Sequence, residues 1–187
     1  MAITTIEGIM AKKETVLNKL NSHRALTANP RKVVFLDFDG VMVTDRYQTQ
    51  LKKSNYPLRD SFGAKFDPLC VEFLKKIVDR TDADIVVTST WKIEMKQEGI
   101  RQMWNERHLP GKVIGVTPDI NPIHRGDEID AWVDECGESC RYAIIDDTPF
   151  TDFFREEQLQ FLFQVDELIG IDGNTVLRVI EHLNSSK

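Results

Sequence analysis

The sequence predicts an α/β fold in which a central parallel sheet of about five strands lies between two layers of helices. Short apolar segments of strand length alternate along the chain with longer segments of helical periodicity, an alternation typical of a parallel sheet. Three of the apolar segments end in polar residues, first in acids, then in hydroxyls, and finally in acids again. Ligands bind outside the carboxyl ends of parallel strands, so these endings are expected to share one crevice.

The first third of the chain predicts an extension, a strand, a flap and a helix. With 187 residues and 41% hydrophobic content, one well-buried domain is expected over 31–187. Apolar residues at mostly helical spacing between positions 6 and 20 predict a helix within an N-terminal extension, 1–30. A buried strand at 32–36 is followed by a polar, irregular stretch at 44–65, expected to form a short flap at about 42–66. Asp67 and Pro68 provide the start of a helix that runs to about Asp79.

The rest of the chain continues the alternation. The predicted elements are a strand from about Ile85, a helix over 91–108, a strand at 112–116, a helix over 126–136 stopped by Gly137, strands at 142–145 and 161–165, and a helix over 174–183. The tryptophans Trp91, Trp104 and Trp132 fall at helical spacing with other apolar residues, which indicates core packing.

Net charge and cysteine content limit the class of protein. A formal net charge of −6 argues against nucleic-acid binding through bulk charge and leaves room for a local basic patch. Cys70, Cys136 and Cys140 lack the spacing of a zinc site, so reduced thiols in a cytoplasmic protein are expected, with a Cys136–Cys140 disulfide as the alternative. The first twenty residues lack a continuous apolar core, which argues against a signal peptide or a membrane span.

The most informative motif is Asp37-Phe38-Asp39-Gly40-Val41, where the first strand ends. Side chains alternate along a strand, so Asp37 and Asp39 lean to the same side. Two crowded carboxylates repel each other, and a bound divalent metal is the simplest compensation. A solvated Asp-x-Asp-Gly turn is the alternative, since Asp and Gly are favoured turn residues.

Four features, in this order, resemble the haloacid dehalogenase (HAD) superfamily. They are Asp37-x-Asp39-Gly-Val, a strand ending in Thr88 and Ser89, a basic residue that opens a helix, and a strand ending in Asp146-Asp147. The resemblance covers about residues 32–165. Ser/Thr-x-Trp after the second strand, the segment from Arg125 to Ile129, and the acid pair look like the phosphatase-type HAD domains of Swiss-Army-knife RNA repair proteins. A Rossmann-like three-layer sandwich is therefore implied, and short insertions at both cap positions imply an essentially capless member.

The resemblance implies a phosphatase that hydrolyses phosphate monoesters through an aspartyl-phosphate. Asp37 would be the nucleophile, and Asp39 would protonate the leaving oxygen and then activate water. The remaining implied roles fall on phosphate-binding groups. Thr88 would donate a hydrogen bond to a phosphoryl oxygen, Ser89 and Gly40 would help to bind substrate, and Arg125 would fill the third-motif position usually held by lysine, with Lys92 as the competing candidate.

Magnesium is the cofactor that the resemblance implies. Its protein ligands would be the Asp37 carboxylate, the Asp39 backbone carbonyl and a carboxylate of Asp146 or Asp147. The sequence leaves open which member of the acid pair is the direct ligand.

The predicted flap bears on the substrate. It has a local excess of positive charge with interleaved aromatic residues, namely Arg46, Lys52, Lys53, Arg59 and Lys65 against Asp45 and Asp60, with Tyr47, Tyr56 and Phe62. Such a flap could hold the backbone and stack the bases of a nucleic-acid end, or it could be solvated and flexible. A nucleotide or polynucleotide end is therefore the favoured substrate.

Three other functions remain open. One is phosphotransfer to another hydroxyl by the same residues, and another is a noncatalytic module that binds metal or phosphate. The third is a receiver-type phospho-acceptor domain, which would carry its adjacent acid pair on the first strand, whereas Asp146-Asp147 comes late in this chain. No membrane partner is expected, and the oligomeric state is left open.

Overall fold

The computed structural model describes residues 30–121, 124–136 and 140–185. In this part of the chain, five parallel strands form one sheet in the order β5-β4-β1-β6-β7. The strands are β1 (Arg31–Leu36), β4 (Asp84–Val87), β5 (Val113–Val116), β6 (Cys140–Asp146) and β7 (Leu162–Gln164). The predicted α/β fold with a central parallel sheet is confirmed. The helix expected within 1–30 and the stop at Gly137 lie outside the described residues.

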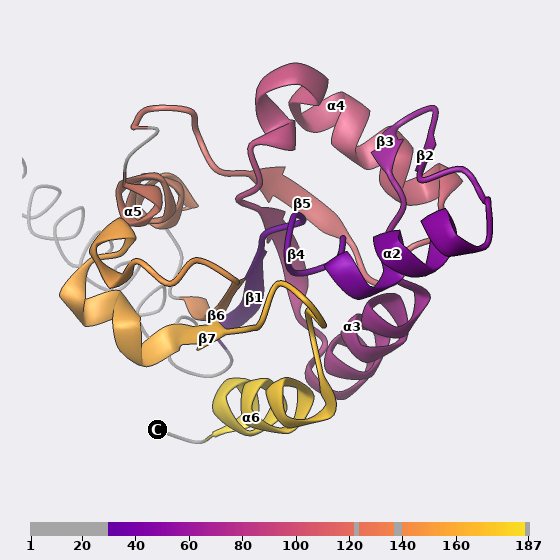
Figure 1. Ribbon diagram of the computed structural model, residues 1–187. Coiled ribbons are helices and arrows are strands. Elements are labelled where there is room, and N and C mark those ends of the chain that lie inside the picture. The colour runs from indigo at the N-terminus through magenta and orange to yellow at the C-terminus, as the bar shows by residue number, and fades with distance from the viewer. Residues whose placement is uncertain (1–29, 122–123, 137–139, 186–187) are drawn as a thin grey trace, which may run out of the picture.

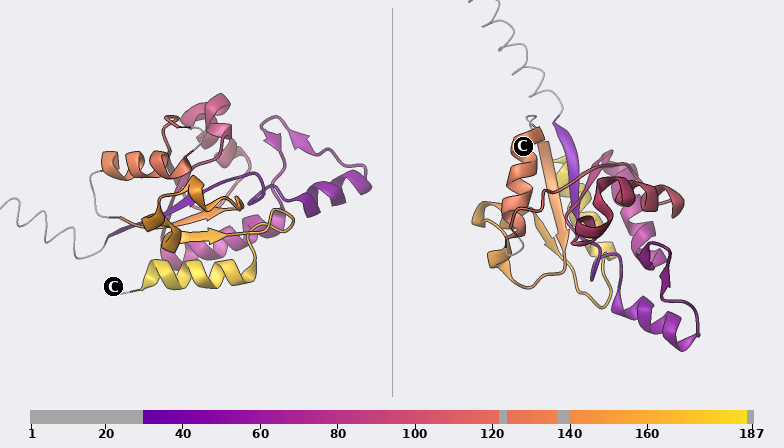
Figure 2. Two further views of the ribbon diagram at one scale, coloured as in Figure 1. Left: turned by 60° about the vertical axis from the view of Figure 1, so that its left-hand side comes forward. Right: turned by 90° about the horizontal axis from the view of Figure 1, so that it is seen from above.

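Helices cover both faces of this sheet (Figures 1 and 2). On one face, α3 (Pro68–Thr81) packs beside α6 (Gly173–Asn184), and on the other lies α5 (Arg125–Cys136). Near the edge strand β5 lies α4 (Trp91–Glu106). The connection from β6 to β7 contains two short 3-10 helices, η1 (Thr151–Phe153) and η2 (Glu156–Phe161), on the α5 side. This arrangement is the expected three-layer sandwich.

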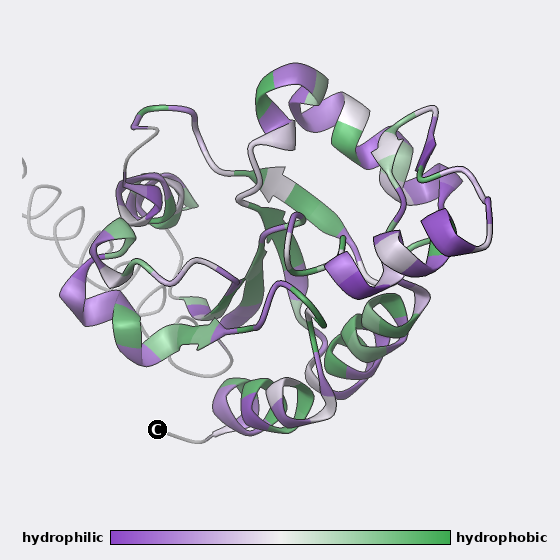
Figure 3. Cartoon of the chain, in the orientation of Figure 1, coloured by the Kyte–Doolittle hydropathy of each residue, from purple (hydrophilic) through white to green (hydrophobic). Residues whose placement is uncertain are grey.

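The core is divided by the sheet into two apolar clusters. Val34 and Leu36 of β1 face the cluster that includes α3, α6 and the C-terminal half of α4. Val33 and Phe35 face the opposite cluster, beneath α5. A central parallel strand is buried on both faces, which is why the last four residues of β1, 33–36, are all apolar and fully buried, and why the centre of the sheet is largely green in Figure 3.

The predicted start of α3 is confirmed by its cap. The Asp67 side chain accepts a hydrogen bond from the Leu69 backbone at 2.9 Å, and Pro68 is the first helical residue. The predicted 91–108 helix is interrupted by Lys96, whose φ of 55° is not helical. This interruption makes α4 a kinked helix.

The stretch at 44–65 is not irregular, and that prediction was wrong. It contains α2 (Asp45–Lys53) followed by a hairpin of β2 (Arg59–Asp60) and β3 (Gly63–Ala64). In α2, Leu51 is buried and the other positions are mostly polar, so the segment has few of the apolar residues from which a helix is recognised. The hairpin strands are two residues long, too short to show the alternation that identifies a strand.

The sequence raised two further questions, about membrane-spanning helices and about a disulfide. No helix in the described part of the chain is long and apolar enough to cross a membrane. Cys136 is a free thiol, so the alternative Cys136–Cys140 disulfide is not formed, and Cys70 is a buried thiol in α3.

Candidate active site

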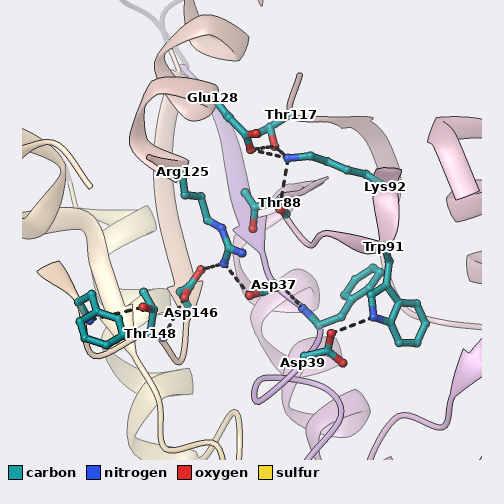
Figure 4. A network of polar contacts seen from close by, with 12 residues as sticks. Asp37, Asp39, Thr88, Trp91, Lys92, Thr117, Arg125, Glu128, Asp146 and Thr148 are labelled. Atoms are coloured by element: carbon teal, nitrogen blue, oxygen red, sulfur yellow. Dashed lines mark hydrogen bonds and ion pairs between the residues drawn. The ribbon is translucent and has the colours of Figure 1, made fainter. Parts of the chain in front are cut away.

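The carboxyl ends of three neighbouring strands place the predicted site residues in one crevice (Figure 4). Asp37 directly follows β1, Thr88 directly follows β4, and Asp146 ends β6. The sheet ladder continues past the strand ends, because the Asp37 amide donates to the Ile145 carbonyl at 3.1 Å and the Thr88 amide donates to the Leu36 carbonyl at 3.0 Å. The predicted common crevice is therefore present.

Three carboxylates form an acidic cluster in this crevice. One oxygen from each of Asp37, Asp146 and Asp147 lies within 4.8 Å of the others. Asp146 is fully buried, and Asp37 is buried, with its Oδ1 accepting a hydrogen bond from the Phe38 backbone at 2.7 Å. Burial raises the pKa of both Asp146 and Asp147, and the charge of Asp37 raises it further. The cluster is therefore stable in its charged form only with cations beside it.

Arg125 supplies one of these cations from the first residue of α5. Its Nη1 donates to Asp37 Oδ2 at 2.5 Å and also to Asp146 Oδ2 (Figure 4). Burial alone would lower the pKa of Arg125, but the two carboxylates raise it above its usual value. The guanidinium is therefore charged at any physiological pH, as a group that neutralises an anionic intermediate must be.

The same cluster fits a divalent metal. Its donors are carboxylate oxygens, which are the ligands that Mg²⁺ prefers. Arg125 pairs with Asp37 and Asp146, so its single positive charge stands against three carboxylates and leaves an excess of negative charge. Asp146 and Asp147 both belong to the cluster, so the geometry is compatible with either as the direct ligand.

Asp39 lies apart from the acidic cluster. Its Oδ2 accepts a hydrogen bond from the indole Nε1 of Trp91 at 3.0 Å. The pKa of Asp39 is raised, first because neighbouring atoms desolvate it and also because Asp37 is close, while the Trp91 hydrogen bond lowers it. A carboxyl that is exposed yet raised in pKa suits a group that exchanges protons with substrate and water.

Thr88 and Ser89 follow β4, and Figure 4 shows the Thr88 side chain beside Arg125 and Asp37. Both residues are almost completely buried, and neither Thr88 Oγ1 nor Ser89 Oγ has a hydrogen-bond partner among the described residues. Buried hydroxyls are nearly always paired, so two unpaired ones are unusual. The Thr88 hydroxyl therefore does not form a hydrogen bond with the neighbouring backbone, which would be its role at an ordinary strand end.

Lys92 pairs with a residue outside the acidic cluster. Its Nζ forms an ion pair with Glu128 and donates to Thr117 Oγ1 at 2.7 Å and to the Thr88 carbonyl at 3.4 Å. Burial lowers the pKa of Lys92, and Glu128 partly offsets this effect. Figure 4 shows this network behind the Thr88 turn, whereas Arg125 points at Asp37. The geometry therefore favours Arg125 over Lys92 for the third-motif position.

Gly40 has a steric role. Its φ is +69°, its amide donates to the Val43 carbonyl at 2.9 Å, and a Cβ at this position would lie 2.0 Å from Asp147 Oδ2. A side chain at position 40 would displace the Asp147 carboxylate. The predicted contact of Gly40 with substrate remains a prediction.

Sequence reasoning missed Trp91 and Glu128 as parts of the site. Trp91 packs against the core, as expected, but it is only partly buried and its Nε1 also donates to Asp39. The available signal was its position directly after the Thr88-Ser89-Thr90 turn, where the first residue of a helix faces the crevice. For Glu128, the signal was a charged residue next to Ile129 on the buried side of α5.

Comparison with known proteins agrees with this geometry. The family model described as the HAD domain in Swiss Army Knife RNA repair proteins matches residues 33–176. This span runs from β1 into α6 and includes every site residue described above. No curated protein gives a significant match.

Proposed function

Because the chain belongs to the family of HAD domains found in Swiss Army Knife RNA repair proteins, we propose that it is a magnesium-dependent phosphatase acting through an aspartyl-phosphate. A HAD domain indicates phosphoesterase activity of the hydrolase type in general. The finer proposal is that the substrate is a phosphate monoester at a nucleotide or polynucleotide end, met in the cytoplasm. The geometry of the crevice supports the chemical part of this proposal.

In this proposal, Asp37 acts as the nucleophile. One of its oxygens bonds to phosphorus while the bond from phosphorus to the ester oxygen breaks, and Asp39 gives its proton to that oxygen. Asp39 then takes a proton from water, whose oxygen attacks phosphorus and releases inorganic phosphate. Asp37 is thereby restored as a carboxylate, and Asp39 is protonated again.

The unpaired hydroxyls carry the proposal. Thr88 offers a buried donor beside Asp37, Ser89 offers a second one next to it in sequence, and Arg125 brings a fixed positive charge to Asp37. Preorganised donors and cations of this kind stabilise the charge on a phosphoryl group during transfer. A core built for stability alone would pair both hydroxyls or replace them with apolar groups.

The acidic cluster would hold the metal. Asp37, the Asp39 carbonyl, and Asp146 or Asp147 would be its protein ligands, and the ion would supply positive charge against the phosphoryl oxygens.

The test is phosphate release from nucleotides and from 3′- and 5′-phosphorylated oligonucleotides, with magnesium or with EDTA. We expect phosphate release only when magnesium is present. For Asp37→Asn, kcat should fall by about 10³-fold or more, because the nucleophile is removed. Asp79→Asn is the matched control, since this exposed acid on α3 pairs with Lys75. Undiminished release by Asp37→Asn would refute the mechanism, and stable phosphate on Asp37 would support the phospho-acceptor interpretation.

A further inference from the structure

A cleft of about 430 Å³ lies beside Asp39, between the β2–β3 hairpin and the start of α4. Its volume is in the range of small-molecule sites, which is about 300–1,000 Å³. The lining residues that matter for recognition are Asp39, Arg59, Phe62, Trp91 and Glu94. Nothing in the chemistry of phosphoryl transfer itself requires this cleft.

The position of the cleft identifies which part of a substrate would enter it. Asp39 lies at its wall, and in the proposed function Asp39 protonates the leaving oxygen. The group attached to that oxygen must therefore start at Asp39 and extend away from Asp37. The cleft lies on this path.

The aromatic wall is fixed before substrate arrives. The Trp91 ring packs edge-on against Phe38 at 5.5 Å between centroids, and its Nε1 is held by Asp39. The hairpin backbone approaches the indole closely, since a Cβ at Gly63 would lie 3.0 Å from Trp91 Cη2. Little conformational freedom is lost when a ligand meets a wall of this kind.

The charges at the cleft narrow the ligand class. Arg59 is an exposed cation on β2, whereas Arg46, also in the predicted basic flap, pairs with Asp67 at 2.7 Å. Aromatic rings combined with a cation are the usual surface for single-stranded nucleic acid, because every base has a flat face and a phosphate follows it. Glu94 adds an acceptor that suits a base amino group or a ribose hydroxyl.

We propose that this cleft is a leaving-group subsite that binds the terminal nucleoside of a single-stranded polynucleotide. The base lies against Trp91 and Phe62, and Arg59 lies near the phosphate that joins this nucleoside to the next. A nucleoside can enter only if its base is unpaired and unstacked, so a frayed or single-stranded end is preferred over a blunt duplex end. The proposal rests on the proposed function, because it takes the direction of the leaving group from Asp39.

The kinetic test compares three substrates in the presence of magnesium. They are a phosphorylated single-stranded trinucleotide, the same end within a blunt duplex, and glycerol phosphate, which has no base. For Phe62→Leu, we expect kcat/KM on the trinucleotide to fall by about tenfold, while kcat/KM on glycerol phosphate is unchanged. Lys76→Gln on α3 is the control, because this lysine pairs with Glu72. Equal losses on trinucleotide and glycerol phosphate, or no loss on either, would overturn the subsite.

A binding measurement separates this proposal from the proposed function. Binding of the labelled trinucleotide to Asp37→Asn protein is followed by fluorescence anisotropy, with and without Phe62→Leu. Binding that is weakened about tenfold by Phe62→Leu supports the subsite even if no substrate is hydrolysed. Turnover of glycerol phosphate without trinucleotide binding refutes the subsite and leaves the phosphatase intact.

Discussion

At the scale of single residues, the indole of Trp91 influences the acid that it contacts. Its Nε1 donates to Asp39 Oδ2, and this hydrogen bond lowers a pKa that desolvation raises. Leaving-group protonation needs the protonated carboxyl, so activity should fall as the pH rises through the pKa of Asp39. Trp91 therefore shifts the alkaline limit of activity downward.

Trp91→Phe should move that limit to higher pH. The variant removes the donor that stabilises the charged carboxylate, so the pKa of Asp39 rises and protonated enzyme persists at higher pH. The measurement is the pH dependence of kcat/KM on glycerol phosphate, a substrate that lacks a base for the cleft. Trp132→Phe is the control, since Trp132 belongs to α5 and packs against Phe35 of β1. An alkaline limit of activity that stays in place or moves to lower pH would contradict this effect of Trp91 on Asp39.

A second prediction concerns the contribution of the Lys92–Glu128 ion pair to the free energy of unfolding. Lys92→Met leaves Glu128 buried without its cation, which should reduce the free energy of unfolding by about 3–5 kcal/mol. The double variant Lys92→Met/Glu128→Leu replaces both charges by apolar groups and should recover most of this loss. Urea unfolding of the two variants, beside Lys76→Met as an exposed control, measures the difference. A double variant no more stable than the single one would show that the charges themselves are needed.

At the scale of elements, the β2–β3 hairpin depends on Arg107 of the α4 C-terminus. The Arg107 guanidinium donates to both carboxylate oxygens of Asp60, at 3.0 and 2.7 Å, and to the Ala64 carbonyl at 3.0 Å. It also lies over the Phe66 ring, 4.7 Å from the centroid. A two-stranded hairpin is at best marginally stable alone, so this clamp holds the outer wall of the cleft.

Arg107→Lys should loosen the hairpin without unfolding the protein. Lysine keeps the charge but cannot form the paired hydrogen bonds to Asp60. Loss of a charged hydrogen bond, worth about 1.5–3 kcal/mol, should speed amide exchange in residues 59–64 by about tenfold or more. Hydrogen exchange read by mass spectrometry checks this, with exchange in β1 as the internal control. Faster exchange throughout the chain would instead make Arg107 a residue of global stability.

The elements that sequence reasoning found are those with long periodicity or explicit caps. Asp67 and Pro68 mark α3, and the apolar spacing of α5 and α6 predicts both helices within a residue or two of their ends. The helix α2 and the hairpin were missed because they bury few side chains. Tertiary contacts such as the Arg107 clamp hold them in place, and these contacts leave no local pattern.

The residues of the site divide in the same way, into those that a local sequence pattern predicts and those that depend on tertiary contacts. Asp37, Thr88 and Asp146 were predictable as neighbours, because parallel strands bring their carboxyl ends to one edge. Trp91 and Lys92 are adjacent in sequence but point to opposite sides of the Thr88 turn, one toward Asp39 and the other toward Glu128. Sequence spacing does not reveal which way the first turn of a helix faces.

At the scale of the whole molecule, the C-terminal segment closes over the segment that follows β1. The amide of Ile171 donates to the Val41 carbonyl at 3.2 Å, and the amide of Asp45 donates to the Glu167 carbonyl at 3.2 Å. Gly170, with a φ of +66°, lies at the centre of this contact, where a Cβ would be 2.3 Å from the Val41 carbonyl oxygen. Distant parts of the chain therefore meet through a residue that must be glycine.

Gly170→Ala should destabilise the whole fold. The left-handed backbone alone costs about 1–2 kcal/mol with a side chain, and the clash with the Val41 carbonyl adds to it. Gly173→Ala is the matched control, because nothing lies within 4 Å of its would-be Cβ, and it should be neutral or stabilising by about 0.4–1 kcal/mol. Thermal unfolding of both variants measures the contrast. Similar melting temperatures for the two would contradict the close packing described here.

The order of the strands has a consequence for biosynthesis. The central strand β1 is the first of the sheet to leave the ribosome, yet its two neighbours come from positions 84–87 and 140–146. Until β6 has been translated, the apolar segment Val33–Leu36 has an open edge that can pair with other chains. Folding is therefore dominated by contacts distant in sequence and is expected to be slow. Asp37 therefore emerges early, but the crevice around it can form only after β6 has been translated and has paired with β1.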